Sequence, residues 1–147
     1  MTMTERAPTA SGAELYYQVQ QFYAEQMQLL DAGAAEDWAE TFTEDGVFAA
    51  NAHPRPSVGR DDIARAAREA TDVYAAKGVQ RRHWLGMVRV EPRDADTVAA
   101  QCYALVIETP RGGQAAIRVS TRCEDLLVRS GGRWQIKERR VTRDDLV

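Results

Sequence analysis

Residues 82–90, Arg-His-Trp-Leu-Gly-Met-Val-Arg-Val, are the stretch of this chain that decides its fold. Their composition and period-2 pattern predict a β-strand that buries one face. Before this stretch, apolar residues recur at helical spacing, and we expect helices at about 13–32, 35–42 and 61–77. After it, Gly- and Pro-containing turns separate three more expected strands, at 97–108, 115–128 and 133–142. The chain therefore changes from a helical half to a strand-rich half.

This order of elements indicates the fold class. Turns as short as Ser130-Gly131-Gly132 favour antiparallel neighbours, because parallel pairing needs a long crossover. Helices followed by a meander of strands are typical of an α+β domain. We expect a strongly curved antiparallel sheet packed on the three helices of the N-terminal half, enclosing a pocket. A short strand at 47–50 and a Pro-containing loop at 51–59 lie between the helices. The domain spans 13–147, after a disordered tail at 1–12.

Composition excludes several classes of function. The chain has 147 residues and a net charge of −3, so it lacks the basic surface that nucleic-acid binding requires. It contains no run of about 20 apolar residues that could span a bilayer, and its polar start is unlike a secretory signal. Cys102 and Cys123 lack a C-x-x-C context and are expected to be reduced thiols. These features predict a soluble cytoplasmic protein with no nucleic-acid or membrane partner.

The sequence also offers no recognisable metal or cofactor site. Its only histidines, His53 and His83, are thirty residues apart, and neither belongs to an H-x-H or H-E-x-x-H motif. A P-loop, a G-x-G-x-x-G fingerprint and a G-x-S-x-G nucleophile elbow are all missing. We therefore expect neither metal nor cofactor, and acid–base chemistry by side chains remains.

The best candidates for such chemistry are His83 and Asp31. An imidazole exchanges protons readily near neutral pH, and a carboxylate partner would orient it. Asp31 ends the first expected helix, just before a stop at Gly33, and is the acidic residue expected to point into the pocket. Such a pair could remove a proton next to a carbonyl and return it to a departing hydroxyl. Two plainer interpretations stay open: His83 as a structural residue of the sheet, and Asp31 as a solvated helix end.

Alternation along the strands assigns the remaining polar residues to faces. It places His83 with Leu85, Met87 and Arg89, and Trp84 on the opposite face. In the last strand it groups Arg140 with Trp134, Ile136 and Glu138, and it separates Arg140 from Arg139, with one of the two arginines solvated. Other candidate pocket residues are Tyr23, Tyr103, Glu108 and His53, although Tyr23 fits a core position and His53 fits an exposed loop.

Several short motifs carry a family resemblance. They are Leu30-Asp31, Glu36-Asp37-Trp38, Phe42 to Phe48, Gly59 to Ile63, Arg82 to Gly86, and Gly132 to Arg139. In this order and spacing the chain resembles the nuclear-transport-factor-2-like superfamily, closest to its SnoaL-like polyketide-cyclase and scytalone-dehydratase-like branch. The resemblance covers nearly everything from Ala13 to Leu146. It implies a cone-shaped α+β fold with a curved sheet around a deep apolar pocket.

The resemblance also implies a function. Asp31 and His83 match the acid–base residues of the scytalone-dehydratase-like enzymes, whereas their second histidine has no match and Glu108 lies in that neighbourhood. A cofactor-free cyclase, dehydratase or isomerase acting on an aromatic or polyketide-like small molecule is implied. Its substrate contacts would be Tyr23, Trp84, Tyr103, Glu108, Arg140 and His53. A homodimer formed through the outer face of the sheet is also implied. The alternative is a non-catalytic accessory or small-molecule-binding subunit, similar to the β subunit of ring-hydroxylating dioxygenases.

Overall fold

The fold was determined as a computed structural model, which describes residues 12–147. Three helices lie in the N-terminal half: α1 (Gly12–Asp31), α2 (Ala35–Ala39) and α3 (Arg60–Ala76). The strands are β1 (Phe42–Ala50), β2 (Ser57–Val58), β3 (Val79–Asp94), β4 (Thr97–Pro110), β5 (Ala116–Ser130) and β6 (Arg133–Arg143), and the 3-10 helix η1 (Asp144–Leu146) follows. The predicted tail lies outside the described residues, except for Gly12, which begins α1.

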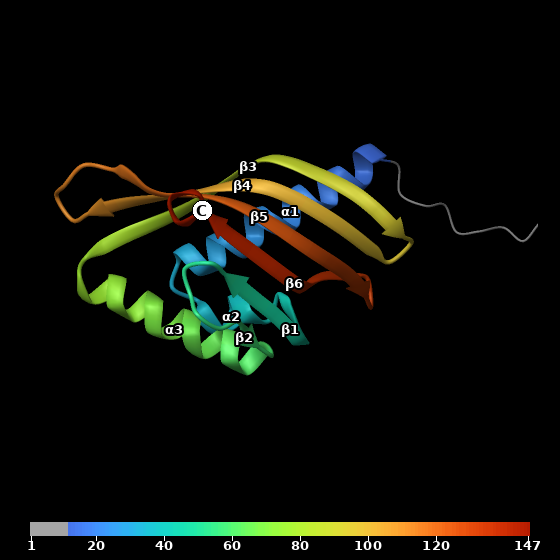
Figure 1. Ribbon diagram of the computed structural model, residues 1–147, viewed down its shortest axis with the longest axis horizontal. Helices are drawn as coiled ribbons and strands as arrows, with labels where there is room; N and C mark the ends of the chain where they lie inside the picture. The colour runs from blue at the N-terminus through green and yellow to red at the C-terminus, as the bar shows by residue number, and fades with distance from the viewer. Residues whose placement is uncertain (1–11) are drawn as a thin grey trace, which may run out of the picture.

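The strands form one six-stranded sheet in the order β2-β1-β6-β5-β4-β3. All neighbours are antiparallel except β1 and β6, which run parallel. Figure 1 shows the long strands β3 to β6 curving together, with α2 and α3 beside β1 and with α1 crossing behind the strands. The predicted α+β class and the curved, mainly antiparallel sheet are therefore confirmed.

The start of β1 differs from the sequence prediction. The residues expected as a turn, 43–46, lie within β1, and α2 ends at Ala39 rather than at Phe42. Phe42 pairs with Ile136 of β6, and its ring packs edge-on against Trp38 with a 5.0 Å centroid separation. Burial of both rings outweighs the turn propensity of the polar residues, which are accommodated by a register shift between Phe42 and Val47.

A β-bulge changes the predicted faces of β3. The register with β4 shifts between Gly86 and Arg89, and Met87 has a φ of 52°. One extra residue in a strand reverses the facing of every residue beyond it. Val88 is consequently buried, and Met87 is 77% exposed. The prediction that Met87 and Arg89 share the face of His83 is wrong.

A second irregularity reverses the prediction for β6. The pairing with β5 shifts between Leu126 and Leu127, so that Lys137 is the unpaired residue of β6. Beyond this point Arg139 turns inward and is only 4% exposed, whereas Arg140 is exposed. The two arginines do lie on opposite faces, but the expectation that Arg140 shares the inner face with Ile136 is wrong.

The described helices carry no membrane-spanning candidate. No helix within residues 12–147 is long and apolar enough to cross a bilayer. The buried residues instead form a core between α1, α2, α3 and one face of the sheet, which we call the inner face; the opposite face is called the outer face.

Candidate functional site

Asp31 is held in position by the way α1 ends. The N–H of Gly33 donates to the carbonyl of Leu30, and the N–H of Ala34 donates to that of Leu29. This paired arrangement, with Gly33 at a φ of 84°, is a Schellman motif, as the glycine in the sequence predicted. It fixes the last helical turn and therefore the direction of the Asp31 side chain.

His83 meets Asp31 because β3 is an edge strand. An edge strand presents backbone N–H groups that no neighbouring strand satisfies. The N–H of His83 donates to Oδ2 of Asp31 at 3.0 Å, and ring Nδ1 lies 2.6 Å from Oδ1 of the same carboxylate. The side chains of His83 and Asp31 are 18% and 6% exposed, respectively. The two predicted acid–base residues are thus brought together in direct contact.

The contact determines which nitrogen of the ring can react. An ionised carboxylate only accepts hydrogen bonds, so Nδ1 carries a proton, and Nε2 is the acceptor of the neutral ring. Nε2 forms no hydrogen bond with residues 12–147, and it is not among their buried atoms that lack a hydrogen-bond partner, which are Trp38 Nε1 and Arg81 Nε. Nε2 therefore faces solvent, where it can accept or donate a proton.

The inner face near His83 is not fully covered by the helices. Leu85, Ala104, Val119 and Val141 belong to this face, as their register partners show, yet each is only partly buried. A close-packed core would bury such apolar side chains almost completely. Their remaining exposure indicates that solvent reaches the inner face beside the Asp31–His83 pair.

Glu108 also lies on the inner face, but its carboxylate is already engaged. Oε2 of Glu108 is 3.2 Å from Nε of Arg81, and the guanidinium of Arg81 stacks on the ring of Tyr74 with its Cζ 4.2 Å from the centroid. Arg81 lies two residues before His83 on the same face of β3. This half-buried ion pair connects β3, β4 and α3 next to the Asp31–His83 pair.

A second polar cluster, which the sequence did not reveal, lies deeper in the core. Arg139 donates from Nε to Oδ1 and from Nη2 to Oδ2 of Asp125, both at 2.9 Å. Tyr23 donates its hydroxyl to Oδ2 of Asp125 at 2.6 Å. Arg139 Nη2 also donates to Oε1 of Gln26, whose amide donates to the hydroxyl of Thr41. We call these five residues the buried network.

Burial shifts the titration of this network and of the thiols beside it. Burial and the neighbouring Asp125 carboxylate hold the pKa of Tyr23 well above its ordinary value. Burial lowers the pKa of Arg139, but the charge and hydrogen bonds of Asp125, together with Cys123 and Tyr23, raise it overall, so the guanidinium stays charged. A hydrogen bond with Cys102, together with burial, raises the pKa of Cys123.

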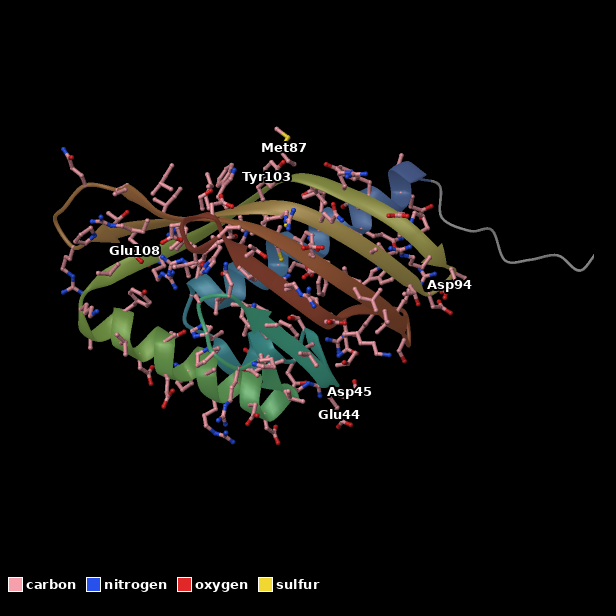
Figure 2. The ribbon with its side chains drawn as sticks, in the orientation of Figure 1. Glu44, Asp45, Met87, Asp94, Tyr103 and Glu108 are labelled. Carbon is pink, nitrogen blue, oxygen red and sulfur yellow. The ribbon has the colours of Figure 1, made fainter. Side chains whose placement is uncertain are left out.

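The other predicted contacts are dispersed. Trp84 and Tyr103 lie on the outer face, 67% and 58% exposed, and Figure 2 shows Tyr103 and Met87 pointing away from α2 and α3. Arg140 is exposed, and His53 lies exposed in the loop after β1. Tyr23 is on the inner side, within the buried network. The alternation of buried and exposed residues along β5 could have predicted that Asp125 faces inward. No sequence signal predicts the irregularity in β6 that turns Arg139 inward.

Within residues 12–147, no three or more His, Cys, Asp and Glu side chains come together in a group that could hold a metal ion.

Comparison with known proteins defines the family. Residues 12–140 match the SnoaL-like domain, and the chain belongs to this family. No curated protein sequence matches the chain.

Several solved structures are similar to it over most of their length. Aln2 from a Streptomyces species is 34% identical, with a TM-score of 0.86 over 92% of this chain and 95% of that one. A protein from Catenulispora acidiphila, solved in complex with S-DNPA, is 37% identical, with a TM-score of 0.78 over 90% and 96% of the two chains. ActVI-ORFA from Streptomyces coelicolor is 30% identical, with a TM-score of 0.82 over 89% and 98%.

Proposed function

We propose that this protein is a cofactor-independent acid–base enzyme, a cyclase, dehydratase or isomerase acting on an aromatic or polyketide-like small molecule. One observation carries the proposal: Asp31 binds both the ring and the backbone of His83, while Nε2 remains open to solvent. Membership of the SnoaL-like family and similarity to a protein solved with S-DNPA support a small organic substrate.

The chemistry follows from the geometry of the pair. Nε2 of His83 removes a proton from the carbon next to a substrate carbonyl, and an enolate forms. Asp31 stabilises the resulting imidazolium through Nδ1. The imidazolium then returns its proton, either to a departing hydroxyl, which leaves as water, or to another carbon, which completes an isomerisation. In a cyclisation the enolate carbon attacks a second carbonyl, and the new alkoxide receives the proton.

All three reactions begin with the same proton removal, which gives a common test. We expect the protein to accelerate exchange of the C2 protons of 1-tetralone with deuterium in D2O, followed by proton NMR. His83→Ala and Asp31→Asn should lower the exchange rate by about 10²–10⁴-fold, while His53→Ala, at the other histidine, should have no effect. Binding of the ketone without exchange would contradict an enzyme and favour the non-catalytic small-molecule-binding subunit.

We further propose a homodimer formed through the outer face. Trp84, Met87, Tyr103 and Ile117 are large apolar side chains exposed on or beside this face. A hollow of about 750 Å³ lies among Trp84, Tyr103, Leu105, Arg122 and Val147. Apolar surface of this extent on a globular domain is typical of an interface, and a second copy of the chain would cover it.

A cytoplasmic location is also proposed. Cys102 and Cys123 are direct partners across β4 and β5, and both are free thiols. Directly opposed residues of antiparallel strands have the Cα spacing of a disulfide, which would be expected to form in an oxidising compartment. Intact-mass measurement of protein isolated from its own cells with thiols trapped should show two free thiols; a disulfide would contradict the proposal.

A further inference from the structure

We infer that Arg139 is a substrate-binding residue: its guanidinium donates a hydrogen bond to a carbonyl or phenolate oxygen at the end of the substrate remote from His83. The inference deepens the proposed function and rests on it. Arg139 has guanidinium N–H groups that form no hydrogen bond with the described part of the chain.

A guanidinium has five N–H groups, and the buried network uses three of them. Nε donates to Asp125, and Nη2 donates to both Asp125 and Gln26. Nη1 forms no hydrogen bond with residues 12–147, yet it is not one of their buried unpaired atoms. Although Arg139 is only 4% exposed, Nη1 must therefore adjoin space that water can enter.

The surroundings of Arg139 make this donor unusually well positioned. Asp125 accepts two parallel bonds from the guanidinium, which fixes its plane, and Gln26 holds it from α1. Preorganised donors lose little freedom when a ligand binds.

The neighbouring side chains indicate the chemistry of the ligand. The rings of Tyr23 and Phe42 each lie 5.8 Å from Cζ of Arg139, and Phe48 is the register partner of Arg139 across β1 and β6. Tyr23 and Phe42 are almost fully buried and hold the guanidinium in place, whereas the ring of Phe48 is only partly buried, and an aromatic ligand can pack against it. The free N–H groups of a permanently charged guanidinium select an acceptor oxygen on that ligand, and a phenolate more strongly than a ketone.

The position of Arg139 separates this contact from the reacting centre. His83 belongs to β3, at one edge of the sheet, and Arg139 belongs to β6, with β4 and β5 between them. Arg139 is aligned with Asp125 of β5 and Ala100 of β4, whereas His83 pairs with Val106, six residues further along β4. The oxygen bound by Arg139 is thus a different oxygen from the carbonyl activated beside His83.

A pair of matched ligands tests the inference by calorimetric titration of the full chain. 6-Hydroxy-1-tetralone differs from 1-tetralone only by a phenolic oxygen remote from the ketone. The wild type should bind the hydroxylated ketone more tightly. Arg139→Lys keeps a positive charge opposite Asp125 but removes Nη1. In this variant the ratio of the affinities for 6-hydroxy-1-tetralone and 1-tetralone should fall about tenfold below the wild-type ratio, while the affinity for 1-tetralone itself changes little. Arg140→Lys, its exposed neighbour, should keep the preference.

The outcomes separate this inference from the proposed function. If the wild type binds both ketones equally, or if Arg139→Lys keeps the preference or loses both affinities together, Arg139 does not bind the remote oxygen, and the proposed function is unaffected. If the wild type binds neither ketone, the proposed function fails and the inference fails with it. The neutral double variant Arg139→Met/Asp125→Asn, which leaves no unpaired charge, must also lack the preference; should it retain it, the inference is overturned even if the lysine variant does not fold.

Discussion

The carboxylate of Asp31 binds His83 at two points, the ring nitrogen Nδ1 at 2.6 Å and the backbone N–H at 3.0 Å. One side chain therefore fixes both the tautomer of the imidazole and the attachment of α1 to the free edge of β3. The same two bonds that would orient His83 as the proposed general base also attach α1 to the edge of the sheet.

Loss of Asp31 should therefore reduce stability as well as activity. Asp31→Ala removes two hydrogen bonds to a buried carboxylate, and we expect the free energy of unfolding to fall by about 2–3 kcal/mol. Asp37→Ala removes an exposed carboxylate and should change it by less than about 0.5 kcal/mol. Urea unfolding followed by circular dichroism measures both. Equal effects of the two substitutions would show that the contact with His83 contributes no stability.

The buried network predicts that substitutions of Arg139 and Asp125 have strongly non-additive effects on the free energy of unfolding. Arg139→Met leaves the Asp125 carboxylate buried without its cation, which should cost about 3–5 kcal/mol of unfolding free energy. Asp125→Asn in the same chain removes the unpaired charge and should recover most of that loss. Arg140→Met serves as the solvated control. Additive losses in the double variant, measured by denaturant titration, would contradict a coupled pair.

Tyr23 should make the protein sensitive to alkali. Because burial and Asp125 raise its pKa in the folded state, both states hold the phenolic proton below about pH 10, and the stabilisation is complete there. Above that pH the unfolded chain releases the proton and the folded protein keeps it, so stability falls. Tyr23→Phe should show a shallower fall between about pH 9 and 11 in urea titrations. Tyr17→Phe, at an exposed tyrosine of α1, should retain the wild-type slope.

Met87 is the only non-glycine residue with positive φ in the described residues 12–147, and its side chain is exposed. Glycine adopts this conformation without strain, so Met87→Gly should raise the free energy of unfolding by about 0.5–1 kcal/mol relative to Met87→Ala, which keeps the strain. Met87→Val, with a branched Cβ, should be the least stable of the three. A thermal-unfolding ranking in any other order would contradict strain at the bulge.

The proposed dimer has a direct test in solution. Tyr103→Glu introduces a charge at the centre of the apolar outer face, and we expect sedimentation velocity to show a monomer where the wild type shows a dimer. Tyr17→Glu is the matched control, because Tyr17 is similarly exposed on α1, away from the outer face. A monomeric wild type would exclude the outer face as a dimer interface at the concentration used.

The candidate site was predictable to the extent that its signals are local. Asp31 lies two residues before a glycine that ends α1, and His83 lies early in a strand, before the bulge at Met87. Neither placement depends on a distant register. Trp84 and Tyr103 were expected near the substrate by resemblance, yet alternation already placed Trp84 opposite His83, and the structure confirms that separation.

The sequence by itself determined the order of the three helices and the five longer strands and the α+β class, and it singled out Asp31 and His83 as candidates, because helix periodicity, strand periodicity and glycine stops act over a few residues. The short strand β2 (Ser57–Val58), inside the segment predicted as a loop, was missed. Only the tertiary structure decided which arginine of the pair at 139 and 140 faces the core. One unpaired residue at Lys137 reverses the facing of the rest of β6. Whether a strand accommodates such a residue depends on packing against Asp125, Tyr23 and Gln26, which lie 14 to 116 residues away from Arg139 in sequence.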